Sequence, residues 1–216
     1  MTEAEWLACD NRQPMLEHFR DRFSSRKLRL FACACCRRVW PFLSPGSRTA
    51  LEIAERFADD EVGAAELELA SERAHTAARS AEDEAVVLAT LPDAWFAAVD
   101  AASSAAGRES FLGWPGRNEY NGERLMEEHR GFAELLRDIF GNPFRPIAFA
   151  PEWRTDTVRA LAREMYESRD FGAMPILADA LQDAGCDNDD ILNHCRDPKG
   201  AHVRGCWVVD WVLEKG

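Results

Sequence analysis

The chain has 216 residues, of which 46% are hydrophobic, and its formal net charge is −12, from 38 acidic and 26 basic residues. This length and composition are sufficient to bury a substantial core, so they exclude a mainly disordered protein. The acidic balance argues against a protein whose main partner is the phosphate backbone of nucleic acid, because that binding needs clustered Lys and Arg.

The N-terminal segment is predicted to form two short amphipathic helices. Thr2 followed by Glu5 matches the capping-box pattern that begins a helix. Pro14 suits the first turn of a second helix, which we expect to run over 15–23.

A third helix is predicted over 26–43, where Ser25 can act as its N-cap. Its sequence is apolar around most of the helix circumference, so the helix should be central to the fold. Pro45 and the following glycine are expected to end it, and Ser47 to begin the next helix, over 48–60.

An Ala- and Glu-rich helical region continues to about residue 106 and ends at a Gly/Pro-rich loop over 107–122. The loop contains Trp114 and Tyr120 and is too long to be a simple connector. A second Pro-rich loop, over 141–153, ends at Trp153. The three aromatic side chains are expected to be exposed and available to a protein partner.

The second half of the chain again shows helical signals, and the alternating β-branched pattern of strands is nearly absent throughout. We therefore predict an all-α, multi-helix orthogonal bundle with two long Gly/Pro-rich loops and no substantial sheet. It should form one globular domain over 1–216, with a candidate seam at 107–122 between a bundle over 1–106 and a helical part over 123–216. The helices expected in the second half are 124–140, 155–168, 175–184, 188–196 and 203–215.

A cluster of cysteine and histidine near the C-terminus offers a candidate zinc site. Cys186, Cys195, His202 and Cys206 have the number and softness of ligands that tetrahedral zinc requires. If the last helix begins at Ala201, His202 and Cys206 lie one turn apart. The two earlier cysteines lack a tight knuckle spacing, and buried cysteine often serves as a small apolar side chain, so packing is the favoured interpretation. Shared zinc would need donor atoms about 3.5 to 4 Å apart.

The remaining cysteines and histidines carry no complete catalytic pattern. The sequence contains no phosphate-cradling glycine loop, no G-x-S-x-G elbow and no H-E-x-x-H motif. Cys33, Cys35 and Cys36 lie in the apolar third helix and are expected to be buried and inert. His194 is interpreted as an exposed neighbour of Cys195, because adjacent helical residues point about 100° apart.

The function predicted from the sequence is that of a non-enzymatic protein-interaction or scaffold module without a cofactor. The first alternative is the zinc- or thiol-based protein described above. A second alternative is a nucleic-acid-binding accessory protein that uses the basic stretch over 20–38, although the acidic region over 52–84 is the expected partner of those arginines. We predict a cytoplasmic protein without membrane contact. The sequence has seven cysteines, an odd number, and their spacing does not form a disulfide framework. It also shows neither a leader nor a membrane-spanning segment.

Several blocks recur together in a known group of sequences. The blocks "LRLFACACCRRVW", "IFGNPFRP" and "HVRGCWVVD" make the chain resemble an uncharacterised paralogous family of planctomycete helical proteins, sometimes labelled SMI1/KNR4-like. The resemblance spans nearly the full chain. It implies no known activity and no functional residue.

Overall fold

The protein is helical throughout the part of the chain that the structure describes. The computed structural model describes the backbone of residues 1–109, 122–198 and 200–215, and their side chains except those of 106–109 and 122–125. Within these ranges every regular element is a helix and there is no strand, which confirms the all-α prediction. None of the described helices combines the length and apolar composition needed to cross a bilayer.

The chain divides into two compact units, an N-terminal unit, Met1–Leu136, and a C-terminal unit, Arg137–Gly216. The division falls within the last turns of helix α8, Gly122–Phe140. It therefore lies C-terminal to the candidate seam at 107–122. Residues 110–121 of that seam lie outside the described residues.

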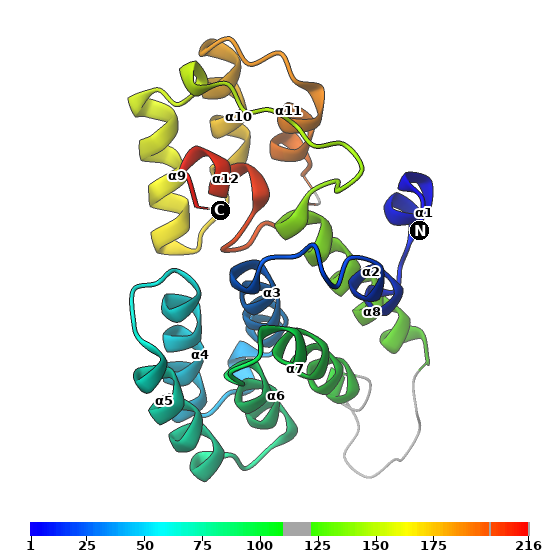
Figure 1. Ribbon diagram of the computed structural model, residues 1–216, viewed down its shortest axis with the longest axis vertical. Coiled ribbons are helices and arrows are strands. Elements are labelled where there is room, and N and C mark those ends of the chain that lie inside the picture. Colours follow the sequence, from blue (N-terminus) through cyan, green and yellow to red (C-terminus); the bar gives the residue numbers. More distant parts are fainter. Residues whose placement is uncertain (110–121, 199, 216) are drawn as a thin grey trace. The chain divides into compact units, whose positions relative to one another are not determined.

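The N-terminal unit consists of helices (Figure 1). Besides the first part of α8 they are α1 (Glu3–Ala8), α2 (Arg12–His18), α3 (Ser25–Arg38), the 3₁₀ turn η1 (Trp40–Phe42), α4 (Pro45–Ala58), α5 (Ala64–Ala77), α6 (Ala81–Ala89) and α7 (Ala94–Glu109). The sequence predicted the first four α-helices with shifted ends, and predicted only one continuous helical region where α5, α6 and α7 lie.

Short polar side chains begin most of these helices. Thr2 and Glu5 form the predicted capping box at α1. Ser24, rather than Ser25, caps α3, and Ser44 caps α4 by accepting from the backbone N–H of Ser47. The expectation that Pro45 ends a helix was wrong, because Pro45 is the first residue of α4, where proline loses no backbone hydrogen bond.

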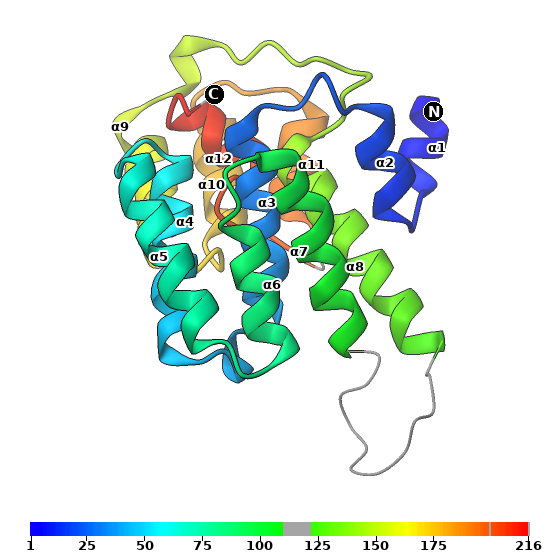
Figure 2. The same ribbon diagram turned by 60° about the horizontal axis from the view of Figure 1, so that its bottom comes forward.

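Helix α3 is the centre of the N-terminal unit. It packs against α4, α6 and α7, which surround it in Figure 2. Phe31, Cys33, Cys35 and Cys36 are at most 1% exposed, as expected for a helix that is apolar on most sides. The predicted burial of the three cysteines is therefore confirmed, and desolvation raises the pKa of their thiols, which favours the protonated form.

The arginines of the basic stretch over 20–38 are largely engaged within the N-terminal unit. Nε and Nη2 of Arg37 each lie 2.8 Å from a carboxylate oxygen of Glu55, whose side chain is 3% exposed. Such a bidentate pair fixes both partners. Two further pairs join Arg26 to Asp59 and Arg38 to Glu128. The acidic region over 52–84 therefore supplies two of these three carboxylates.

The C-terminal unit packs its helices around a separate apolar core. The helices are η2 (Pro151–Trp153), α9 (Asp156–Ser168), α10 (Met174–Asp183), α11 (Asp189–Arg196) and α12 (Trp207–Val212). Helix α9 packs against α10 and α12, and α10 packs against α11 (Figure 1). Cys186, Cys195 and Cys206 all belong to the core of this unit.

The last helix is shorter than the predicted 203–215. Gly205 has a φ of 97°, a left-handed conformation that favours glycine, and the backbone N–H of Cys206 donates to the carbonyl of Val203 in a turn. This turn precedes the helix, so Cys206 occupies the N-cap position of α12.

Candidate metal centre

Four potential metal ligands meet within the C-terminal unit. Asp138, His194, His202 and Cys206 each offer one donor atom, and these atoms all lie within 4.8 Å of one another. The four residues come from distant points in the chain but from one compact unit. Their oxygen, nitrogen and sulfur donors are those that divalent transition metals prefer.

Three helix ends and one connection position the four side chains. Asp138 lies in the last turn of α8, His194 in the last turn of α11, and Cys206 at the N-cap of α12. His202 lies in the connection between α11 and α12. A Cβ atom at Gly200 would lie 3.0 Å from His202 Nε2, so a side chain at this position would crowd the ring.

The carboxylate of Asp138 organises the two imidazole rings. His202 Nδ1 lies 2.9 Å from Asp138 Oδ1, and His194 Nε2 lies 3.2 Å from the same oxygen. The other oxygen, Oδ2, accepts a hydrogen bond of 3.0 Å from the backbone N–H of Val203. Both oxygens of the Asp138 carboxylate therefore have polar partners. The His194 and His202 rings also contact each other edge to face, with their centroids 4.8 Å apart.

His194 Nε2 is also the link to the sulfur. It lies 3.2 Å from Cys206 Sγ as well as 3.2 Å from Asp138 Oδ1. A ring nitrogen carries at most one proton, so it cannot direct a good hydrogen bond at both neighbours at once. A cation placed among the donor atoms would instead use the lone pairs of all four.

Asp138 is ionised in this environment. Its side chain is 3% exposed, and burial alone would raise its pKa. The hydrogen bonds from His194 and His202 act in the opposite direction and hold the Asp138 pKa below its usual range. The centre therefore contains a buried negative charge.

The Cys206 thiol is fully buried, and nearby backbone N–H groups partly stabilise its ionised form. Desolvation raises the pKa of its thiol well above the ordinary value, and the nearby Asp138 carboxylate adds to this increase. The backbone N–H groups of Val208 and Val209, in the first turn of α12, lower the pKa. A bound divalent cation would lower the pKa of the Cys206 thiol, since coordination deprotonates a thiol.

Half of the ligand set predicted from the sequence takes part in this centre. His202 and Cys206 belong to it, but Cys186 and Cys195 are not among its donors. Both lie in the apolar core, 2% and 0% exposed. Desolvation, followed by the charge of Asp138, raises the pKa of Cys195 to about 12. Packing is therefore the structural role of these two cysteines.

His194 and Asp138 were missed as candidate ligands. The interpretation of His194 as an exposed neighbour was wrong, because its side chain is only 19% exposed and faces the centre. The 100° angle between adjacent helical residues does direct His194 and Cys195 to different surroundings, but it is His194 that faces the centre and Cys195 that lies in the core. Asp138 had no sequence signal beyond its place near the end of a predicted helix.

The aromatic residues predicted to contact a partner are only partly described. Trp114 and Tyr120 lie outside the described residues. Trp153 is partly buried against the core of the C-terminal unit, where its ring lies edge to face with Phe149 at 5.3 Å. The expected exposure of Trp153 was therefore wrong, because its indole completes the aromatic edge of this core.

Comparison of the chain with protein-family models, curated proteins and solved structures finds no match.

Proposed function

We propose that the C-terminal unit binds one zinc ion through Asp138, His194, His202 and Cys206, and that the protein is a non-enzymatic helical module stabilised by this ion. The observation that carries the proposal is the convergence of four donor atoms within 4.8 Å of one another. The remainder of the chain, with its helical N-terminal unit, serves in this proposal as the scaffold for a protein partner.

The separations between donors suit zinc. In tetrahedral geometry, zinc bonds of about 2.0 to 2.3 Å place the donor atoms about 3.3 to 3.8 Å apart, slightly closer than the 3.5 to 4 Å expected from the sequence. Three of the six donor separations measure 2.9, 3.2 and 3.2 Å, and the others are at most 4.8 Å. To accommodate the ion, the short separations would have to widen by a few tenths of an ångström, and a separation near 4.8 Å would have to shorten by about 1 Å.

The charge of the donor set also favours a divalent cation. The Asp138 carboxylate and a Cys206 thiolate together balance the two positive charges of zinc, so the complex is formally neutral. A neutral centre avoids most of the cost of burying an isolated charge. The backbone N–H of Val203 on Asp138 and those of Val208 and Val209 near Cys206 supply the outer contacts that orient metal ligands.

A structural role fits better than a catalytic one. Catalytic zinc keeps a position open for water or substrate, whereas four protein donors fill a tetrahedral site. Here the side chains of Asp138 and His202 are 3% and 6% exposed. The ion would join the ends of α8, α11 and α12, and so contribute its binding free energy to folding of this unit.

Thermal unfolding with and without a chelator tests the proposal. The full chain, purified without added metal, should lose at least about 10 °C of melting temperature on metal removal, because a few kcal/mol produce such a shift in a small domain. Added zinc should restore the melting temperature, and added magnesium should not. An unchanged melting temperature after complete chelation would contradict the proposal.

A further inference from the structure

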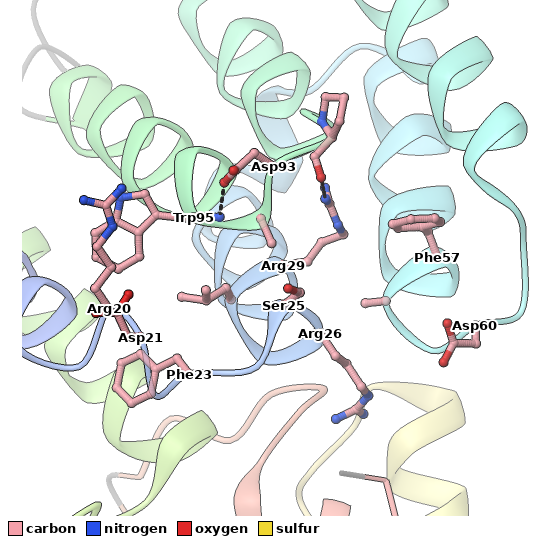
Figure 3. Close-up of a pocket in the computed structure, with 14 residues that line it drawn as sticks. Arg20, Asp21, Phe23, Ser25, Arg26, Arg29, Phe57, Asp60, Asp93 and Trp95 are labelled. Carbon is pink, nitrogen blue, oxygen red and sulfur yellow. Dashed lines mark hydrogen bonds between the residues drawn. The ribbon is translucent and has the colours of Figure 1, made fainter.

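The N-terminal unit contains a pocket that is independent of the metal centre. Its volume is about 680 Å³, within the range of small-molecule sites. It is lined by the segment before α3, the first turns of α3, the end of α4, and the connection from α6 into α7 (Figure 3). All of these elements belong to the same compact unit.

A buried guanidinium forms part of the pocket wall. Arg29 is 2% exposed, and its Nη1 and Nη2 donate to the carbonyl oxygens of Ala89 and Pro92 at 3.0 and 2.9 Å. Its charge also lies 5.2 Å from the ring centroid of Phe57. Burial lowers the Arg29 pKa, but arginine stays protonated in proteins.

Arg29 is not paired with a carboxylate, although one lies near it. Among the described residues, no salt bridge joins Arg29 to an acidic side chain. Asp93 is close enough to raise the Arg29 pKa, yet its Oδ1 accepts from the backbone N–H groups of Trp95 and Phe96 at 2.8 and 3.1 Å. Asp93 therefore acts mainly as the cap of α7, and the buried cation keeps donor capacity for an anion.

The other charges at the pocket limit the kind of anion. Arg26 is paired with Asp59 at 2.9 Å, and Arg20 lies 5.0 Å from the ring centroid of Trp95. Asp21 and Asp60 are exposed residues of the lining. These two carboxylates would repel a multiply charged group such as phosphate, so a single negative charge is the better match to one buried guanidinium.

The walls favour a planar ring. Phe23, Phe57 and Trp95 line the pocket from three different segments, and Figure 3 shows Phe57 beside Arg29 and Trp95 beside Arg20. The N-terminal ends of two long helices, α3 and α7, also lie at the pocket and add positive potential. Aromatic faces and a guanidinium together fit a flat apolar body that carries one anionic group.

We propose that this pocket binds a small aromatic carboxylate, with the carboxylate directed to Arg29 and the ring against Phe57, the aromatic side chain beside Arg29 in Figure 3. The site requires no metal and is independent of the proposed zinc centre.

Calorimetric titration of the full chain with naphthoate tests this inference. Naphthoate should bind saturably, and both its neutral alcohol counterpart, naphthyl methanol, and the dianion naphthyl phosphate should bind at least about fivefold more weakly. Equal binding of the neutral alcohol would overturn the assignment of the carboxylate to Arg29. Tighter binding of the phosphate, or no saturable binding of naphthoate, would overturn the proposed ligand class.

Two variants and a control locate the binding. Ser25→Trp places a large side chain at the exposed start of α3, on the pocket lining, and should abolish naphthoate binding without removing a buried group. Arg29→Lys keeps the charge but loses the planar fork, and should weaken binding at least about fivefold. Arg22→Gln, an exposed arginine outside the lining, should leave binding unchanged. Unchanged affinity in Ser25→Trp would place the ligand elsewhere and overturn the inference.

Discussion

At the scale of single residues, neighbours in the chain have opposite roles. His194 faces the candidate metal centre, and Cys195 lies in the apolar core with no exposed surface. Both are potential zinc ligands by residue type. The two side chains differ in the direction in which they leave α11. Substitution of each residue in turn therefore gives a matched pair of variants.

The variant His194→Ala should lose most of the bound zinc, because it removes one of four donors. The variant Cys195→Ala should retain about one zinc per chain, since Cys195 contributes packing rather than a bond to the ion. Elemental analysis of both purified proteins measures the difference. Retained zinc in His194→Ala together with lost zinc in Cys195→Ala would instead favour the ligand set predicted from the sequence.

The seven cysteines should also differ in reactivity. Cys9 is partly exposed and the other six are buried in the folded protein. A thiol reagent should therefore label Cys9 rapidly in the native state, and the remaining cysteines only after denaturation. The variant Cys9→Ser is the control, and it should show no fast labelling. Fast labelling of Cys33, Cys35 or Cys36 in that variant would mean that α3 is not the buried centre of its unit.

The candidate site could be predicted from the sequence only in part, for a physical reason. His202 and Cys206 are four residues apart, and such local spacing is readable. Asp138 lies 64 positions before His202, so its place in the centre depends on how α8 packs within the C-terminal unit. No local pattern encodes that contact. The last helix does not begin at Ala201, the condition under which these two residues would lie one helical turn apart, but the turn at Gly205 brings the His202 and Cys206 side chains together in its place.

At the scale of secondary-structure elements, most helix starts with a polar cap were predicted to within one to three residues. The predicted cap Thr2 is confirmed, and Asn188 and Thr155 cap α11 and α9 within one residue of the predicted helix starts. Errors occurred where the same residue could either end one helix or begin the next, as at Pro45. Cap chemistry is local, whereas the choice between ending and beginning a helix depends on packing.

Asp83 provides a test of one such element contact. Its Oδ1 accepts from the backbone N–H of Ser44, at the start of α4, and its Oδ2 from that of Arg79. Burial alone would raise its pKa, but hydrogen bonds from Ser47, Ser44 and Arg79 hold the pKa below the ordinary value of 3.8. The ionised carboxylate therefore stabilises the fold above the unfolded pKa, and this stability is lost as the pH falls through the lower folded pKa.

The variant Asp83→Asn should accordingly be less stable than the wild type at pH 7, by about 1 to 3 kcal/mol. The difference should shrink as the pH falls below about 4, where the wild-type carboxyl also becomes neutral. Urea unfolding of both proteins across this pH range measures it. A difference that is constant with pH would contradict the role given to the charge.

At the scale of the whole molecule, the chain consists of two compact units with separate proposed sites. The aromatic and guanidinium pocket belongs to Met1–Leu136, and the metal centre to Arg137–Gly216. The all-α class was predictable because helical periodicity and caps recur along the whole chain. The division within α8 was not, because a continuous helix carries no break in its sequence pattern.

The effects of metal removal should therefore be local. Hydrogen exchange of the full chain should become faster in α11 and in residues 201–212 after chelation, since these segments carry three of the four ligands. Exchange in α3 and α7 should change little. Equal acceleration along the entire chain would show that the ion, if bound, supports more than its own unit.

The most direct test of the zinc proposal is the metal content of protein purified without added metal. The proposed centre predicts about one zinc per chain. Replacement of this metal by cobalt should give the intense visible absorption of a four-coordinate site and a thiolate charge-transfer band that is lost in Cys206→Ser. Protein that contains no stoichiometric metal, and that fails to bind zinc or cobalt when either is supplied, would contradict the account.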